Sequence, residues 1–256
     1  MSFSLAGQST LITGAGSGLG RAAALALAKA GATVVVTELP DRLEAAAETV
    51  SLVGATGGHA VALPLEVLDL TSIEACVRDA AAVAGRLDLL VNNAGTAIRK
   101  RAFDVTEEDW DRVMDVNLKG AFFVAQAVGR VMRDQTPRGG AIVNVASIMG
   151  LAGYFDRAAY CASKAGMINV TRVMAIEWAE HGIRVNAVCP TFVDTPLTRP
   201  IFAANPAFSD DVMNRTPMRR LATPEEVAAA TLYLLSPAAG MTTGHALPVD
   251  GGWTAW

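Results

Sequence analysis

Tyr160 and Lys164 are four residues apart and form the first pattern in this sequence that could transfer protons. Residues 158–180 are predicted to be helical, and two residues at this spacing on a helix share one face. An ammonium group close to a phenol favours the phenolate and lowers a tyrosine pKa that starts at about 10. We therefore expect Tyr160 to act as an acid or base near neutral pH. A tyrosine and a lysine at this spacing are also common without a catalytic role. The motifs around them are therefore needed to choose between the two interpretations.

Further polar residues follow two predicted strands. Ser147 comes directly after the strand at 141–146, and Asn92-Asn93-Ala94-Gly95 closes the strand at 87–91. Open α/β sheets bind ligands at the carboxyl ends of their strands. The small residues of the second motif leave room for a ligand beside the backbone, so we expect both segments to border a site.

A glycine-rich turn follows the first predicted strand, with the sequence Thr13-Gly14-Ala15-Gly16-Ser17-Gly18-Leu19-Gly20-Arg21, and a helix begins within it. Glycine lets the backbone turn tightly and approach a pyrophosphate, whose charge is attracted by the N–H groups at a helix start. The spacing departs from the strict GxGxxG pattern, so a tight turn without a ligand is the alternative interpretation.

Glu38 indicates which dinucleotide would bind. It follows the second predicted strand, 20 residues after Gly18, where a carboxylate can accept hydrogen bonds from the adenosine ribose. A carboxylate there repels the 2′-phosphate of NADP, and no basic residue stands at Ser17 or Leu39, although Arg42 is near. We therefore predict NAD, with NADP as the less favoured cofactor. By itself, Glu38 could also be a solvated loop acid.

Short β-branched runs alternate with longer helical stretches along the whole chain. Strands are predicted at 9–13, 33–37, 60–63, 87–91, 141–146, 184–188 and 246–249, and helices at 19–30, 41–53, 71–84, 106–133, 158–180 and 224–235. The run Thr33-Val-Val-Val-Thr37 is apolar without alternation, as in a sheet covered on both faces. The pattern predicts one α/β domain over residues 1–256, a doubly wound parallel sheet of about seven strands. The rhythm lapses at 190–223, which we expect to be a substrate loop.

The composition excludes several classes of partner. The chain has 256 residues, 52% of them apolar, and a net charge of −4. Nucleic acids and anionic membranes reward clustered positive charge, so neither is expected to bind. Three cysteines and three histidines are scattered, which predicts reduced thiols and no metal site. The N-terminal residues lack the features of a signal peptide, and no apolar run reaches the roughly 18 residues of a membrane span. We expect a cytoplasmic protein.

Taken together and in order, these motifs resemble the short-chain dehydrogenase/reductase family over essentially the whole chain. The glycine turn is similar to its TGxxxGxG motif, and Asn92-Asn93-Ala94-Gly95, Asn117, Ser147, Tyr160 and Lys164 are similar to its other signatures. The resemblance implies a Rossmann-fold enzyme that interconverts a secondary alcohol and a ketone by hydride transfer with NAD.

The resemblance also implies a role for each catalytic residue. Tyr160 would exchange a proton with the substrate oxygen, and Ser147 would hydrogen-bond the same oxygen. Lys164 would bind the nicotinamide ribose and lower the pKa of Tyr160. Asn117 would hold a water in a proton relay; from its position inside a predicted helix alone, it is a buried amide that faces its neighbours.

The residues that the resemblance assigns to cofactor contacts come from every part of the chain. They are Gly14, Ser17, Gly18, Leu19, Gly20, Glu38, Glu66, Val67, Asn93, Ala94, Gly95, Tyr160, Lys164, Pro190, Val193 and Thr195. Asn93 would lie near the adenosine ribose, and Thr195 would contact the nicotinamide carboxamide. Two positions depart from the family pattern. Thr191 replaces a glycine that could adopt positive φ, and Glu66 replaces an aspartate that contacts adenine.

The substrate pocket is expected to form from residues 96–101, 148–157 and 191–221. These segments combine apolar side chains with four basic residues, Arg99, Lys100, Arg157 and Arg199. This mixture, and the ending Val249-Asp250-Gly251-Gly252-Trp253, favour a small polar or anionic substrate such as a sugar alcohol, sugar acid or hydroxy acid. One alternative is a 3-oxoacyl-thioester reductase that uses NADPH. A second, of another class, is a regulator that binds NAD without catalysis.

The resemblance implies a homotetramer. The predicted helices at 106–133 and 158–180 carry apolar residues on more than one face, which indicates subunit packing. The apolar tail Trp253-Thr254-Ala255-Trp256 is unusual for a free terminus, and we expect it to pack at a subunit interface.

Overall fold

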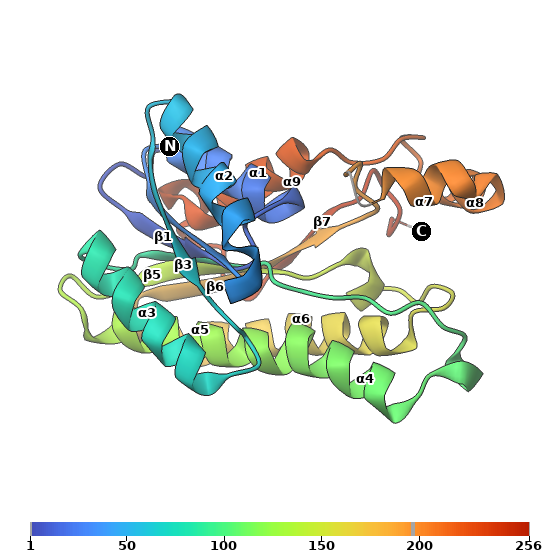
Figure 1. Ribbon diagram of the computed structural model, residues 1–256, viewed down its shortest axis with the longest axis horizontal. Coiled ribbons are helices and arrows are strands. Elements are labelled where there is room, and N and C mark those ends of the chain that lie inside the picture. Colours follow the sequence, from blue (N-terminus) through green and yellow to red (C-terminus); the bar gives the residue numbers. More distant parts are fainter. Residues whose placement is uncertain (1, 196–197, 256) are drawn as a thin grey trace.

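One parallel sheet organises the computed structural model, which describes residues 2–195 and 198–255 (Figure 1). In this part of the chain the sheet has seven strands in the order β3-β2-β1-β4-β5-β6-β7. They are β1 (Ser9–Ile12), β2 (Thr33–Glu38), β3 (His59–Pro64), β4 (Leu89–Asn92), β5 (Gly140–Val145), β6 (Ile183–Pro190) and β7 (Ala246–Val249). The order runs outward from β1 in both directions, so the predicted single, doubly wound Rossmann-like domain is confirmed.

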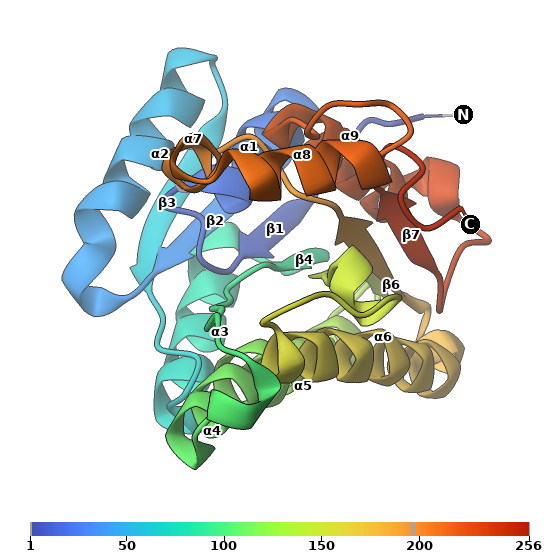
Figure 2. The same ribbon diagram turned by 90° about the vertical axis from the view of Figure 1, so that its right-hand side faces the viewer.

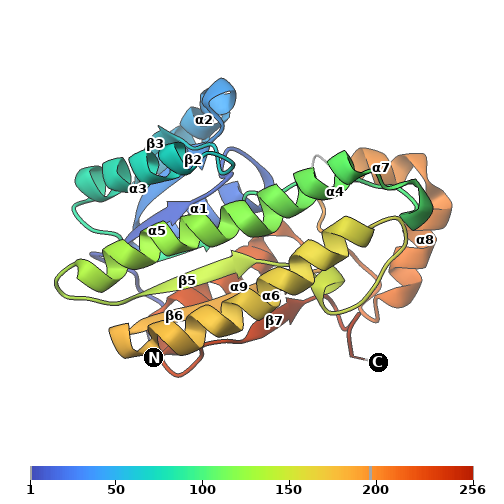
Figure 3. The ribbon, with the colours of Figure 1, turned by 90° about the horizontal axis from the view of Figure 1, so that it is seen from below.

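Helices cover both faces of this sheet. They are α1 (Gly18–Lys29), α2 (Leu43–Ala55), α3 (Leu70–Ala84), α4 (Glu107–Met114), α5 (Ala121–Asp134), α6 (Ala158–Trp178), α7 (Arg199–Ala204), α8 (Pro206–Arg215) and α9 (Pro224–Leu235). Helices α1, α2 and α9 lie on one face, and α3, α5 and α6 lie on the other (Figures 1 and 3).

The valine run of β2 shows how the two layers form. Val34 and Val36 pack into the core under α1, α2 and α9, whereas Val35 points into the core under α3, α5 and α6. Successive side chains of a strand point to opposite faces, so a run without polar residues suits a strand that is covered twice.

Two predicted elements differ from the structure. The single helix expected at 106–133 is interrupted between α4 and α5 by a π-helical segment, Asp115–Gly120. Such wide turns are frequent at functional sites, and this one contains Asn117. The expected loop at 190–223 is partly helical, because it contains α7 and α8. Both helices lie across one end of the sheet (Figure 2).

The C-terminal tail begins inside its own chain. Trp253 is only 8% exposed, and its ring lies 5.7 Å from the ring of Tyr154 and 5.8 Å from that of Phe192. Trp253 is therefore covered by aromatic residues of its own chain, and the expected packing of the tail at a subunit interface stays a prediction. Trp256, the other tryptophan of that prediction, lies outside the described residues.

Three further features bear on the predictions. Within residues 2–195 and 198–255, every helix is too short or too polar to cross a bilayer. In the same residues, no cluster of histidine, cysteine and acidic side chains is arranged to hold a metal ion. Cys76, Cys161 and Cys189 are free thiols.

Candidate active site

The glycine turn between β1 and α1 has a backbone that side chains would obstruct. Gly14 has a φ of +62°, in the left-handed region that favours glycine. A Cβ at Gly20 would lie 2.5 Å from the carbonyl oxygen of Gly14, and one at Gly16 would lie 2.8 Å from a carboxylate oxygen of Glu38. The turn is therefore as tight as the sequence predicts.

Hydrogen bonds from the end of β4 hold this turn in place. The Thr13 hydroxyl accepts from the backbone N–H groups of Asn93 and Ala94 at 2.9 and 2.8 Å. The side-chain amide of Asn93 donates to the carbonyl oxygens of Thr13 and Gly14. Asn93 thus braces the turn itself, a contact that the sequence analysis did not anticipate.

The start of α1 is suited to an anion. Ser17 is the N-cap, and no side chain of the described residues accepts from the first-turn N–H groups. Uncapped N–H groups at a helix start bind phosphate well. The buried hydroxyl oxygen of Thr191, beyond the end of β6, also lacks a hydrogen-bond partner among the described residues. These features fit a bound dinucleotide, which would supply acceptors and donors at both points.

Glu38 is the last residue of β2 and is only 7% exposed. Its carboxylate accepts a hydrogen bond from the Gly16 N–H at 3.2 Å and from the Leu39 N–H at 3.2 Å. Arg42, which is half exposed, approaches to 3.8 Å. The carboxylate is therefore held at the turn by two backbone N–H groups.

The loop after β3 carries Glu66 and Val67, two of the predicted cofactor contacts. The Glu66 carboxylate accepts from the Leu68 N–H at 3.0 Å, so it is used in part to shape its own loop. Val67 is buried, and its carbonyl oxygen lies 2.7 Å from the position of a Cβ at Gly120. This loop therefore packs closely against the π-helical segment.

Tyr160, Ser147 and Lys164 come together at the carboxyl end of β5. Lys164 is 4% exposed, donates to the Val145 carbonyl oxygen at 2.8 Å, and lies 5.7 Å from the centre of the Tyr160 ring. Burial lowers the pKa of Lys164 from 10.5 to about 8. Ser147 is the N-cap of a 3₁₀ turn, Ile148–Gly150, and its hydroxyl accepts from the Met149 N–H.

The pKa of Tyr160 differs from the prediction. Burial raises it above its ordinary value of 10.0, while a hydrogen bond with Ser147 and the positive charge of Arg157 lower it. The expected lowering by Lys164 is wrong for the chain by itself, because desolvation outweighs the favourable contacts and Arg157 supplies the nearby charge. Arg157 stands three residues before Tyr160 and was treated only as a substrate-pocket residue in the sequence analysis.

Asn117 is fully buried, as its interpretation as a helix-facing amide predicts. Its side chain accepts from the Thr96 N–H at 2.7 Å and donates to the Thr96 carbonyl oxygen at 2.9 Å and to the Ser163 hydroxyl at 3.1 Å. A Cβ at Gly95 would lie 3.2 Å from Asn117 and 3.8 Å from the Lys164 ammonium. Gly95 therefore lies between the amide and the lysine.

The segment after β6 completes this end of the sheet. Pro190 ends the strand, Val193 is buried, and the Thr195 hydroxyl lies 3.1 Å from the Thr198 hydroxyl. Within residues 2–195 and 198–255, the residues other than glycine that have positive φ are Asp156 and Arg219. Thr191 therefore has an ordinary backbone conformation, and its departure from the family glycine causes no strain.

The three segments expected to form a substrate pocket do meet. A cavity of about 360 Å³ lies between residues 99–101, residues 154–157 and α8. Tyr160, Met149, Phe192, Phe202 and Phe208 share one apolar cluster beside it. The volume is within the range of small-molecule sites.

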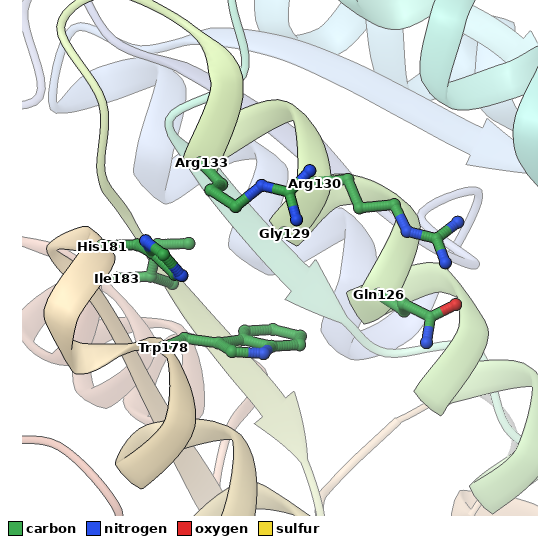
Figure 4. Close-up of a pocket in the computed structure, with 7 residues that line it drawn as sticks. All are labelled: Gln126, Gly129, Arg130, Arg133, Trp178, His181 and Ile183. Atoms are coloured by element: carbon green, nitrogen blue, oxygen red, sulfur yellow. The ribbon is translucent and has the colours of Figure 1, made fainter.

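A second hollow lies between α5 and α6, lined by Gln126, Gly129, Arg130, Arg133, Trp178, His181 and Ile183 (Figure 4). Ile183 is the first residue of β6, so this hollow is at the amino end of a strand, away from Tyr160. Its volume is about 200 Å³. We assign it no catalytic role.

Comparisons with known proteins agree with this geometry. The model of the family described as enoyl-(acyl carrier protein) reductase matches residues 14–254. An NAD-dependent glycerol dehydrogenase from Listeria innocua is 37% identical, over 98% of this chain and 96% of that protein. A short-chain type dehydrogenase/reductase from Mycobacterium marinum is 33% identical with a TM-score of 0.93, covering 99% of this chain and 98% of the other. A gluconate 5-dehydrogenase from Burkholderia cenocepacia, in complex with NADP and tartrate, is 35% identical with a TM-score of 0.93 and the same coverage.

Proposed function

Because the chain belongs to the short-chain dehydrogenase/reductase family, we propose that it is an NAD-dependent oxidoreductase that interconverts a secondary alcohol and a ketone on a small polar substrate. The observation that carries the proposal is the meeting of Tyr160, Ser147 and Lys164 at the carboxyl end of β5, beside the braced glycine turn. The similarity to glycerol and gluconate dehydrogenases supports the substrate class.

In this proposal Tyr160 moves the proton at the substrate oxygen. When the alcohol is oxidised, the phenolate of Tyr160 accepts the hydroxyl proton while the carbon-bound hydrogen leaves as hydride. The bound NAD supplies the hydride acceptor. Ser147 hydrogen-bonds the same substrate oxygen and stabilises the phenolate, since its hydrogen bond already lowers the pKa of Tyr160. In reduction, the neutral phenol, which burial favours, donates the proton back.

The other residues bind and position. Lys164 uses one N–H on Val145, and its remaining protons would bind the ribose hydroxyls of the cofactor. Asn117 holds the backbone of Thr96 and thereby the approach to Lys164 around Gly95. Its side-chain oxygen already accepts a hydrogen bond from Thr96, so a role in holding water would use its second lone pair.

The remaining predicted cofactor contacts divide by the part of the dinucleotide that they would bind. Ser17, Gly18, Leu19 and Gly20 would bind the pyrophosphate at the start of α1, and Val67, Ala94 and Asn93 would border the adenosine. Pro190, Val193 and Thr195 would border the nicotinamide after β6.

Glu38 supports NAD as the cofactor. A buried carboxylate held at the turn accepts hydrogen bonds from a ribose and repels a 2′-phosphate. NADP is the second candidate, because Arg42 lies 3.8 Å from Glu38 and the similar gluconate 5-dehydrogenase carries NADP.

We further propose a cytoplasmic homotetramer in which residues 190–223 cover the substrate. Outward-facing apolar side chains on α6, including Val173 at 46% and Ile176 at 78% exposure, support burial between subunits. Sedimentation of the purified protein tests this assembly, since a monomer would contradict it.

The function is tested by initial rates on a panel of secondary alcohols, with NAD and NADP in parallel. The panel contains polyols, sugar acids, short hydroxy acids, a hydroxyacyl thioester and a steroid alcohol. We expect NAD-linked oxidation of a polar class, and a loss of about 10³-fold in Tyr160→Phe, because general acid–base catalysis contributes on that order.

The controls separate the alternatives. Tyr160→Phe should bind NADH as tightly as the wild type, which shows that the fold is intact. Preference for the thioester with NADP would favour a 3-oxoacyl-thioester reductase instead. Tight NADH binding without turnover of any alcohol would favour a regulator, and unchanged turnover in Tyr160→Phe would contradict the proton-transfer role.

A further inference from the structure

Arg157 is a buried cation on the substrate side of the site. It is the N-cap residue of α6 and is only 9% exposed. Its Nε is buried and has no hydrogen-bond partner among the described residues. Buried polar groups are almost always hydrogen-bonded, and a buried charge without an acceptor destabilises the fold. An unpaired arginine of this kind therefore calls for an acceptor that binds it.

The acidic residues near Arg157 form ion pairs with other basic side chains. Four basic side chains around this face are each paired with a carboxylate: Lys100 with Asp109, Arg101 with Asp156, Arg199 with Asp194, and Arg215 with Asp211. Neither Arg99 nor Arg157 has a carboxylate oxygen of any described residue within 4.0 Å. These two arginines thus present two uncompensated positive charges to one cavity.

Aromatic rings hold the two guanidinium groups in place. Arg157 lies 5.5 Å from the centre of the Phe192 ring, and Arg99 lies 4.9 Å from that of Phe208. The two rings are in edge contact at 5.4 Å. A ring face orients a guanidinium without neutralising its charge, so both groups remain available to bind an anion.

The backbone turns Arg157 inward at some energetic cost. Asp156, the preceding residue, has a φ of +58°, and its carbonyl oxygen accepts from the Lys100 N–H at 3.2 Å. Strained residues of this kind occur often at functional sites. The bond ties the segment that carries Arg99 to the one that carries Arg157. Moreover, burial and, after it, the charge of Arg99 lower the pKa of Arg157, so the positive charge of Arg157 is unfavourable without an anion.

We propose that Arg99 and Arg157 bind an anionic group of the substrate, a carboxylate, so that the preferred substrate is a hydroxy acid or polyhydroxy acid and not a neutral sugar alcohol. This inference rests on the function proposed above and names its substrate class. Arg157 stands one helical turn before Tyr160 and influences its pKa, so a carboxylate bound there lies a few carbon atoms from the reacting oxygen. A phosphate group shares the required chemistry, and the experiment separates the two.

The test compares matched substrates that differ in charge. The kcat/KM values are measured with NAD for sorbitol, D-gluconate and sorbitol 6-phosphate, and for glycerol, D-glycerate and glycerol 3-phosphate. In the wild type we expect the acid to exceed its neutral counterpart by at least about tenfold, since charge-assisted hydrogen bonds to arginine are strong.

The variants Arg99→Gln and Arg157→Gln should each lower kcat/KM for the acid by about tenfold or more, and should change that for the neutral alcohol by less than about threefold. Arg157→Lys should restore part of the loss, because it keeps the charge without the planar fork. Arg130→Gln is the matched control: it removes an exposed positive charge on α5, beside the hollow of Figure 4, and should leave both values unchanged. Thermal unfolding confirms that each variant folds.

A binding measurement separates this inference from the proposed function. D-gluconate and D-glycerate are titrated calorimetrically into Tyr160→Phe with NADH bound, with and without the two arginine substitutions. Binding that the substitutions abolish supports the anion site even if no alcohol is turned over, a result that would count against the enzyme proposal alone.

Two results would overturn the inference. The first is turnover of neutral polyols while neither acid binds nor reacts, which would leave the enzyme proposal intact. The second is a preference for acids that is unchanged in both arginine variants. Selective turnover of the phosphates over the acids would replace the carboxylate with a phosphate at the same two arginines.

Discussion

The glycine turn after β1 and the arginine pair beside α8 belong to one site, but they differ in whether their polar groups have hydrogen-bond partners within the chain. Around the turn, Thr13, Asn93 and Glu38 each bond to backbone groups of the chain. Around the cavity, the buried Nε of Arg157 has no partner in the part of the chain that the structure describes, and the nearby Phe192 ring leaves its charge uncompensated.

This difference separates a preorganised surface from one that a ligand completes. Around the glycine turn, hydrogen bonds to the chain's own backbone hold Thr13, Asn93 and Glu38 in place before a dinucleotide binds. The substrate side carries charge that only a bound anion would neutralise. The first region therefore indicates the reaction class, and the second indicates the substrate.

Substitution of Lys164 should have the largest effect on the free energy of unfolding. It tests whether the hydrogen bonds on the cofactor side compensate for the burial of this ammonium group. Burial lowers its pKa from 10.5 to about 8. Below pH 8 its cation is disfavoured in the folded state; from about pH 8 to pH 10.5 the unfolded chain binds more protons, so this contribution to stability rises with pH. Lys164→Met should thus be more stable than the wild type at pH 7 by up to about 3 kcal/mol, and this advantage should vanish near pH 10.5.

Urea unfolding of both proteins from pH 7 to pH 10 measures this difference, and taking the difference removes the contributions of other groups. Lys29→Met, at an exposed position on α1, is the control and should change the free energy of unfolding by less than about 0.5 kcal/mol. A stability difference that does not vary with pH would show that burial does not disfavour the charged form of Lys164, and would contradict the prediction.

Gly20→Ala tests the tight packing of the turn and should have the next largest effect. The added methyl group would lie 2.5 Å from the Gly14 carbonyl oxygen and 2.7 Å from the Asn93 amide nitrogen. Both neighbours are held by hydrogen bonds, so we expect a loss of about 1–3 kcal/mol in stability. NADH binding should also weaken, as a fluorescence titration would show.

The matched control is Gly54→Ala in α2, where an added Cβ meets no atom within 4 Å. There the substitution should stabilise the protein by about 0.5–1 kcal/mol, because alanine loses less entropy in a helix. If both substitutions behave alike in thermal unfolding, the turn is not sterically constrained.

Glu38→Ala has the smallest expected effect and tests the charge at the ribose end. Loss of a charged acceptor for the ribose should reduce the ratio of kcat/KM for NAD to that for NADP by about tenfold or more. Glu44→Ala, which removes an exposed charge from the first turn of α2, should leave the ratio unchanged. A fixed ratio in Glu38→Ala would mean that another residue selects the cofactor.

Much of the fold could be predicted because its signals are local. The valine run of β2, the glycines that follow β1 and the periodic apolar residues of α9 each report on their own neighbours in the chain. The break at Asp115–Gly120 could not be predicted, because no local sequence pattern distinguishes a π-helical turn from an α-helical one and the segment packs against Val67 and Thr96, which are far away in the sequence. The helices α7 and α8 were missed because their proline and polar residues resemble a loop.

The candidate site was predictable in its residues and less so in its electrostatics. Ser147, Tyr160 and Lys164 meet as expected. The pKa of Tyr160 was predicted in the wrong direction, because desolvation depends on everything packed around the ring. The burial of Trp253 within its own chain was also not predictable, since residues far away in the sequence cover it.

The sequence by itself determined the parallel sheet and the glycine-rich turn, because each rests on residue types at short fixed spacings, and it indicated the reaction class through its resemblance to a known family. Only the tertiary structure decided which of four basic residues near the substrate are uncompensated. Lys100 and Arg199 are paired with carboxylates, whereas Arg99 and Arg157 have none within residues 2–195 and 198–255. Charge compensation depends on which side chains meet in space, and segments from residues 99 to 211 meet here only because the chain is folded.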